Sequence, residues 1–233
     1  MNSITLNGTS STTITGLIIQ SLPPISKPMI RTQVEEIDGR DGDIVTKLGY
    51  AAYDKEISIG LHGSFNIDEV IAFFDSDGIV TFSNEPDKYY KYRITAQADF
   101  DRLLRFRQAT VTFHVQPFKY STTEQPVVET ITTQESVTVT NSGNTLSKPI
   151  ITIEGSGVIN LSLNGNQQLI ISLDTDDSIT IDVSRLEAYT DDVLRNRIVV
   201  GDYDNMSLDP GVNIISWAGT VTGIRIENYS RWI

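Results

Sequence analysis

The chain has 233 residues, of which 39% are hydrophobic and 21% are charged, and it carries a net charge of −12 and no cysteine. Its length suits two domains of ordinary size, and its composition is typical of a globular protein. The lack of cysteine excludes disulfides, thiolate nucleophiles and cysteine-bound metals, while the negative charge argues against sequence-specific nucleic-acid binding. We expect no membrane insertion and no signal peptide, because neither kind of apolar segment is present.

Strand patterns outnumber helix patterns along the chain and predict a mainly β protein. Apolar and polar residues alternate in 57–59, in 90–94 and in 109–115. In the last of these segments, alanine, valine and phenylalanine point to one side, and threonine and histidine point to the other. Such alternation predicts strands that have one buried face and one solvated face.

One segment of the first half predicts a helix instead. Asn66 and Glu69 have the spacing of a capping box. The apolar positions that follow recur at the spacing of one helix face: Ile67, Val70, Ile71 and Phe74. We expect this helix to end near Gly78 and to pack its apolar face on a sheet, which makes the first domain β-rich, of the α+β type, with one short helix.

The second half begins after a stretch rich in serine, threonine, glutamine and glutamate. We therefore predict domains at 1–124 and 135–233, joined by a linker at 125–134. About eight strand signals, spaced by ~8 to 12 residues, predict a β-sandwich or jelly roll in the second domain. An Asn-Gly pair predicts a two-residue hairpin turn within 159–171. The last ~10 residues could finish the sandwich or return to the first domain.

No group of residues has the pattern of a catalytic or metal site, and we expect no enzyme activity, metal or cofactor. The two histidines, His62 and His114, are too few for the usual zinc motifs. The acidic runs 38–43 and 174–177 lack the spacing of a calcium-binding loop and suit turns instead. The sequence also lacks the G-x-S-x-G motif of serine hydrolases.

Four aromatic residues of the second half raise an alternative function. Trp217, Trp232, Tyr189 and Tyr203 could together form a flat platform for sugar rings. A protein of that kind would be a carbohydrate-binding or host-adhesion module. Packing in the core or at interfaces is the simpler interpretation of the same residues.

Several segments resemble, in their order and spacing, those of siphophage distal tail proteins. They are IDGRDGD from Ile37, VTFSNEPDKYYKYRI from Val80, QPFKY from Gln116 and a C-terminal series that starts with NSGNTLSKPIITIEGSG at Asn141. The resemblance implies an N-terminal belt domain that forms a hexameric ring and a C-terminal galectin-like β-sandwich. It also implies a non-enzymatic hub that joins the phage tail tube to the tail-tip or baseplate proteins, with a central channel for DNA.

The resemblance also implies partners and a location. We expect contacts with further copies, in one ring or in stacked rings, with the major tail tube protein, with tail-associated or tail-fibre proteins and, where present, with receptor-binding proteins. The protein would lie at the tail tip of the virion, after synthesis in the bacterial cytoplasm. A tail-tube or terminator protein stays open as an alternative.

One turn is our candidate for the contact between ring subunits. It consists of Gly39, Arg40, Asp41, Gly42 and Asp43. A ring built from head-to-tail contacts needs two different complementary surfaces on each subunit, and Arg40 could pair with a carboxylate of the neighbouring copy.

Overall fold

The computed structural model describes residues 1–75, 77–94, 100–123 and 135–233. The chain divides into two compact units, one of Met1–Thr122 and Ile233 and one of Thr123–Trp232, and each unit has its own hydrophobic core. The predicted linker, 125–134, lies outside the described residues. Within the described ranges, no helix has the length and the apolar character needed to cross a membrane.

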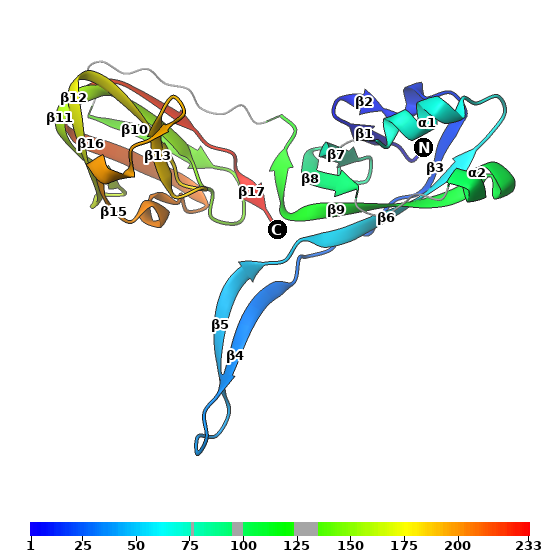
Figure 1. Cartoon of the computed structure of the whole chain (residues 1–233), viewed down its shortest axis with the longest axis horizontal. Helices are drawn as coiled ribbons and strands as arrows, with labels where there is room; N and C mark the ends of the chain where they lie inside the picture. The colour runs from blue at the N-terminus through cyan, green and yellow to red at the C-terminus, as the bar shows by residue number, and fades with distance from the viewer. Residues whose placement is uncertain (76, 95–99, 124–134) are drawn as a thin grey trace. The chain divides into compact units, whose positions relative to one another are not determined.

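In the first unit, seven strands form an antiparallel sheet in the order β2-β1-β7-β8-β9-β6-β3 (Figure 1). The strands are β1 (Ile4–Leu6), β2 (Thr9–Ser10), β3 (Leu17–Ser21), β6 (Tyr53–Leu61), β7 (Gly78–Phe82), β8 (Lys88–Ile94) and β9 (Gln108–Ser121). A 3₁₀ turn, η1 (Ser11–Thr13), follows β2. Two further strands, β4 (Ile30–Glu36) and β5 (Asp43–Tyr50), form a separate two-stranded sheet.

The alternation predicted for the first unit is confirmed. Ile57 on β6 lies opposite Val111 on β9, Ile59 lies opposite Ala109, and all four side chains are buried. Alternate residues of β8 and β9 line the same core, which is completed by phenylalanine and tyrosine rings in edge-to-face contact. Burying one such large apolar side chain contributes about 2 kcal/mol, so this face holds the sheet to the elements that cover it.

The predicted helix forms but is shorter than expected. Helix α1 spans Ile67–Phe73, and the side chain of Asn66 caps its start by accepting a hydrogen bond of 3.1 Å from the Asp68 backbone N–H. The helix ends at Phe73 and not near Gly78, because the backbone N–H of Phe74 turns back to the carbonyl of Ile71. The mainly β class with a short helix is therefore confirmed.

The buried face of α1 also differs from the predicted one. Val70, Phe73 and Phe74 are buried, whereas Ile71 is 38% exposed. A helix of two turns presents few side chains to the sheet, and the two adjacent phenylalanine rings fill the available space. A second short helix, α2 (Phe100–Phe106), was not expected from the sequence.

In the second unit, seven strands form a sheet in the order β10-β16-β11-β12-β13-β14, with β15 paired to β12 (Figure 1). The elements are β10 (Ser136–Asn141), β11 (Ile150–Leu163), β12 (Asn166–Asp182), β13 (Glu187–Thr190), β14 (Val193–Leu194), η2 (Asn196–Ile198), β15 (Val199–Gly201), η3 (Tyr203–Met206), β16 (Gly211–Glu227) and β17 (Arg231–Trp232). The predicted hairpin is confirmed: β11 and β12 meet at Asn164 and Gly165, which have φ angles of 51° and 83°.

The three central strands of the second unit are longer than the short strands that we predicted. β11 has 14 residues, and β12 and β16 have 17 each. Irregularities at Gly155–Gly157 interrupt the pairing of β11 with both neighbours, which lets long strands bend. Gly219 on β16 is required there, because a Cβ atom at this position would lie 2.4 Å from the Val158 carbonyl oxygen.

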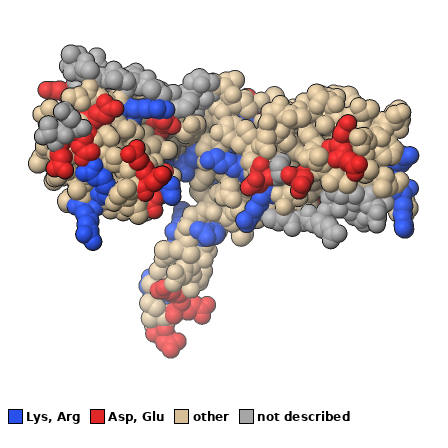
Figure 2. Space-filling view, turned by 45° about the horizontal axis from the view of Figure 1, so that its top comes forward, with Lys and Arg blue, Asp and Glu red and all other residues tan. Residues whose placement is uncertain are grey.

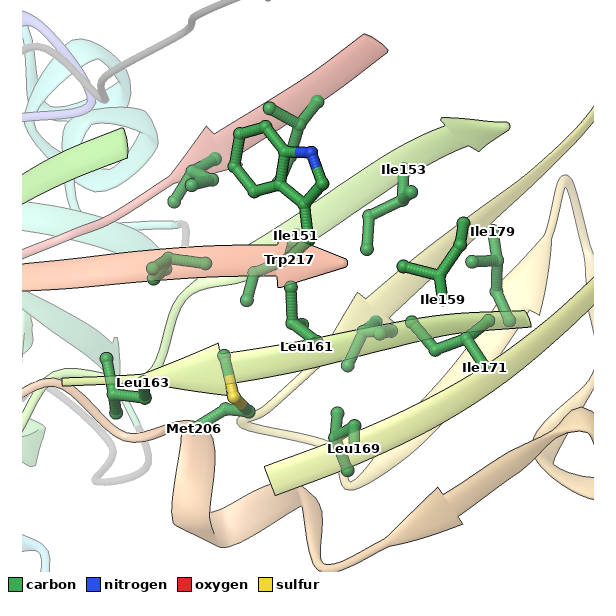
Figure 3. Close-up of a cluster of buried hydrophobic side chains, with 14 of the residues drawn as sticks. Ile151, Ile153, Ile159, Leu161, Leu163, Leu169, Ile171, Ile179, Met206 and Trp217 are labelled. Atoms are coloured by element: carbon green, nitrogen blue, oxygen red, sulfur yellow. The ribbon is translucent and has the colours of Figure 1, made fainter. Parts of the chain in front are cut away.

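The curled sheet of the second unit surrounds one core of isoleucine, leucine and valine side chains (Figure 3). Ile159 and Leu161 on β11 face Ile171 and Leu169 on β12, and all four are fully buried. Trp217 on β16 packs into the same cluster. With no disulfide available to this cysteine-free chain, this apolar packing is the main source of stability for the unit.

Candidate assembly surface

The most exposed part of the first unit is the arm, which we define as residues 30–50. Its strands β4 and β5 pair from Ile30 opposite Tyr50 to Glu36 opposite Asp43, with a bulge beside Arg31 (Figure 1). The arm runs on directly into β6, which begins at Tyr53. A two-stranded ribbon has too few contacts to be very stable alone, so its contacts at the base and with other chains determine its behaviour.

The tip of the arm contains the residues that we predicted for the subunit interface. Gly39 and Gly42 have φ angles of +80° and +78°, which L-amino acids with side chains rarely adopt, and the Arg40 backbone N–H closes the turn on the Ile37 carbonyl at 3.1 Å. The turn predicted for DGRDGD is therefore present, and all five candidate residues, 39–43, are exposed.

The tip of the arm carries mostly acidic side chains. Acidic side chains gather at the end of the arm (Figure 2). The charged residues there are Glu35, Glu36, Asp38, Arg40, Asp41 and Asp43. Across the residues that the structure describes, Arg40 has no ion pair, so its guanidinium can reach a carboxylate of another molecule.

The arm also exposes apolar side chains. Val34 and Val45 lie directly opposite each other on the two strands and are 52% and 53% exposed. Ile37 and Leu48 on the arm are similarly exposed, and Met29, just before the arm, is 70% exposed. Apolar area that is left open on a slender ribbon, next to a charged tip, is typical of a surface that another protein covers.

The base of the arm is fixed to the sheet by a cluster of polar side chains, Tyr53, Lys55, Glu85, Tyr90 and Lys119. Lys55 is only 3% exposed, and its ammonium lies over the rings of Tyr90 and Tyr53, 4.8 and 5.5 Å from their centroids. Glu85 accepts hydrogen bonds from the Tyr90 hydroxyl at 2.5 Å and from the Lys119 ammonium at 2.8 Å. The cluster thus holds two cations around one carboxylate.

Burial changes the acidity of three groups in this cluster. Desolvation lowers the pKa of Lys55, with Glu85 opposing that shift, because removing water disfavours the charged ammonium. Desolvation, together with the negative charge of Glu85, raises the pKa of Tyr53. Burial and the hydrogen bond to Glu85 raise the pKa of Tyr90. Both tyrosines therefore remain neutral donors at physiological pH.

The other residues that the sequence singled out do not converge on a site. His114 lies on the exposed face of β9, where its Nδ1 atom is 2.7 Å from an Asp54 carboxylate oxygen. His62 follows β6 and is exposed. Asp177 pairs with Arg195 at 2.5 Å. Within the described part of the chain, no three histidine, aspartate or glutamate residues cluster as metal ligands do.

The aromatic platform that would favour sugar binding does not include Trp217. This side chain is 6% exposed and belongs to the core of the second unit (Figure 3). Tyr189, Tyr203 and Trp232 are half-buried, and the Tyr203 hydroxyl donates a hydrogen bond to the Asn196 side chain at 3.3 Å. The core interpretation holds for Trp217.

The chain is similar to a protein of known structure along its whole length. No family model matches it, and no curated protein matches it. The Dit protein (gp 19.1) of phage SPP1, described as a paradigm of the hub adsorption apparatus in phages that infect Gram-positive bacteria, superposes with a TM-score of 0.69 at 18% identity, over 100% of both chains. This chain has the Dit fold.

Structures of the phage P2 baseplate in its activated conformation are also similar in outline. The one with calcium has a TM-score of 0.49 at 9% identity and covers 99% of this chain and 98% of the other. The full-length superposition on SPP1 Dit confirms, at the level of the fold, the resemblance to siphophage distal tail proteins that the sequence segments suggested. The polar cluster at the base of the arm was not predicted from the sequence. One signal for it was present, because Lys55 alternates with the buried Ile57 and Ile59 and so lies on the same face of β6.

Proposed function

We propose that this chain is the distal tail hub of a siphophage. In this role, six copies form a ring through their first units, and the ring joins the tail tube to the tail-tip or baseplate proteins and leaves a channel for DNA. The observation that carries the proposal is the full-length agreement with the SPP1 Dit fold, which covers both units and leaves no segment of either chain unmatched.

The arm supports a role in which the protein works through contacts with other chains. Its tip combines several carboxylates with the Arg40 guanidinium, which has no ion pair within the described ranges, and its strands expose apolar side chains. A ring subunit needs a projecting surface and a receiving surface that differ from each other. We assign the projecting surface to the arm, with Gly39, Arg40, Asp41, Gly42 and Asp43 at its end.

The ring and the location follow as parts of the same proposal. The hub would contact the major tail tube protein on one side and tail-associated or fibre proteins on the other, at the tip of the virion tail. It acts by shape and binding, without a catalytic step. The overall negative charge of −12 is suited to a DNA channel, because it disfavours tight binding of the phosphate backbone as DNA passes.

The first experiment is to count subunits. We expect the purified chain to form a hexamer in light scattering and a ring with a central opening in electron micrographs. A chain that remains a monomer at all accessible concentrations, and that is absent from the tails of the phage that encodes it, would contradict the proposal.

The role of the arm in the ring contact is tested with two substitutions at exposed positions, Arg40→Glu and Val45→Asp. Each removes a feature that another copy would contact, and each should shift the protein from hexamer toward monomer. Arg197→Glu, a charge reversal at an exposed position of the second unit, is the control and should assemble normally. If both arm variants assemble like the wild type, the arm does not form the ring contact.

A further inference from the structure

The segment that leads into the arm, 22–29, is not part of a strand, and side chains of the sheet bind several of its carbonyls. It contains Pro23, Pro24 and Pro28, which have no backbone N–H group to donate to a neighbouring strand. Its carbonyl groups remain available as acceptors. The position of this segment therefore depends on which side chains bind those carbonyls.

Three side chains of the first unit bind three carbonyls of this segment. The Asn84 side-chain amide donates to the Pro23 carbonyl at 2.9 Å. The Lys55 ammonium donates to the Pro24 carbonyl at 2.9 Å. The Tyr53 hydroxyl donates to the Ser26 carbonyl at 3.4 Å.

Two further contacts fix the other strand at the base of the arm. The backbone N–H of Ala51 donates to the Met29 carbonyl at 2.8 Å. The ring of Tyr50, at the end of β5, contacts the ring of Phe118 on β9 edge-to-face, with centroids 5.6 Å apart. Both strands of the arm are thus anchored where they leave the sheet.

Lys55 is the unusual member of this set. An ammonium that is 3% exposed loses most of its hydration. Among the described residues, the Pro24 carbonyl, the rings of Tyr53, Tyr90 and Phe82 and the more distant Glu85 compensate for part of that loss. An apolar side chain of similar length would fill the same space at less cost in free energy. What an apolar side chain cannot do is fix the direction of the Pro24 carbonyl.

We propose that Lys55 is a positioning residue that locks the base of the arm and so sets the angle at which the arm leaves the sheet. This inference rests on the proposed ring function, because a projecting arm must meet its neighbour at one angle for a ring to close. A pre-set angle lowers the entropy lost when the contact forms. Lys55 would therefore support assembly without touching the neighbouring copy.

The angle of the arm can be measured directly, because the chain has no cysteine of its own. Nitroxide labels are placed at Thr46→Cys on the arm and Thr110→Cys on β9, both exposed positions. Labelled chains are diluted into unlabelled ones, and the distance distribution is recorded by pulsed electron resonance. We expect one narrow distribution with Lys55 present and a distribution about twice as broad in Lys55→Met, because the base of the arm then samples more positions.

Two variants keep this test independent of folding. Lys148→Met, which removes a lysine of the second unit, should leave the distribution unchanged. Asn84→Ala removes only one neighbouring hydrogen bond from an exposed side chain and should broaden the distribution by a smaller amount than Lys55→Met. If Lys55→Met fails to fold, Asn84→Ala decides the question. A label distance distribution as narrow in Asn84→Ala as in the wild type would contradict the proposal that these side chains fix the base of the arm.

The same variants distinguish the effect of Lys55 on the angle of the arm from its effect on ring assembly. We expect the concentration at which half of the chains are assembled to rise about tenfold in Lys55→Met, since order lost in the free arm must be restored on binding. A broad label distance distribution in the wild type would contradict the proposal that Lys55 fixes the angle of the arm. An equally narrow distribution in Lys55→Met would contradict it too. A broadened distribution with unchanged assembly overturns its role in ring formation. If the wild type never assembles, the ring proposal fails, whereas the label distances still decide whether Lys55 holds the arm.

Discussion

The Arg195 guanidinium donates a hydrogen bond to the Asp177 carboxylate, with 2.5 Å between Nη1 and Oδ2, and ties the start of η2 to the middle of β12. This bond, followed by the one from the Ser178 backbone N–H, lowers the pKa of Asp177. A carboxyl group whose pKa is lower in the folded chain than in the unfolded chain stabilises the fold at pH values above the unfolded value of about 3.9.

The first prediction follows from the lowered pKa of Asp177 in the folded chain. The stabilisation from Asp177 is present at neutral pH and is lost as the pH falls below about 4, through the folded-state pKa. Asp177→Asn should therefore lower the melting temperature at pH 7 and have little effect near pH 2. Asp174→Asn, an exposed neighbour with no ion pair among the described residues, is the control. Equal effects of Asp177→Asn at both pH values would contradict this account.

The second prediction concerns the carboxylate at the base of the arm. Glu85→Gln leaves Lys119 without its counter-charge. The side chains of Lys119 and Glu85 are only 12% and 11% exposed. We expect a loss of about 3 kcal/mol in the free energy of unfolding, as is typical when one partner of a buried pair is removed. Urea denaturation measures it. Glu56→Gln, on the exposed face of β6, should cost little, and an equal loss in both variants would refute the prediction.

The third prediction concerns the pH dependence of Lys55. The pKa of Lys55 is lower in the folded chain than in the unfolded chain, so the unfolded chain binds the ammonium proton more strongly. Burial of the ammonium therefore destabilises the fold at neutral pH. This penalty decreases as the pH rises through the folded-state pKa of Lys55. Lys55→Met should be at least as stable as the wild type at pH 7. That advantage should shrink toward pH 10. A difference in melting temperature that stays constant over this range would exclude the mechanism.

The fourth prediction addresses the core of the second unit. Leu161 is fully buried, so Leu161→Ala should reduce the stability of this unit by about 2 to 5 kcal/mol, through lost apolar contact and the cavity that remains. Val158 lies on the same strand but is 58% exposed, and Val158→Ala should change stability by less than about 0.5 kcal/mol. Thermal unfolding followed by tryptophan fluorescence is suitable, since Trp217 packs in this core.

The fifth prediction uses two glycines with positive φ angles. Gly157 has φ +75°, and a Cβ atom added there would meet no atom within 4 Å, whereas Gly219 has φ +118° and lies against the Val158 carbonyl. Gly157→Ala should cost about 1 kcal/mol from backbone strain alone. Gly219→Ala adds a steric clash of a further ~2 kcal/mol. Equal destabilisation of the two variants would show that close approach of the strands is not what requires Gly219.

Sequence reasoning predicted those elements whose burial follows a simple period. The segments 57–59 and 109–115 alternate because one face meets the core, and the start of α1 is visible because Asn66 caps it. The end of α1 was predicted too late, because Phe74 leaves the helix through a local backbone turn that no residue type demands.

The arm and its base show what the sequence alone does not reveal. The DGRDGD turn was predicted, but the length of β4 and β5 was not, because both faces of the arm are exposed and no alternation is imposed on them. The cluster around Lys55 joins residues that are distant in the chain, such as Glu85 and Lys119. Only the folded sheet brings them together.

The open edges of the arm have one more consequence. In the part of the chain that the structure describes, β4 and β5 form ladder pairs only with each other. A ribbon with open edges can recruit identical ribbons and grow into fibrils. Arg31, Glu35 and Lys47 interrupt its apolar positions with charge, and Gly49 with φ +109° bends one strand beside the bulge. These residues therefore disfavour edge-to-edge association of free chains.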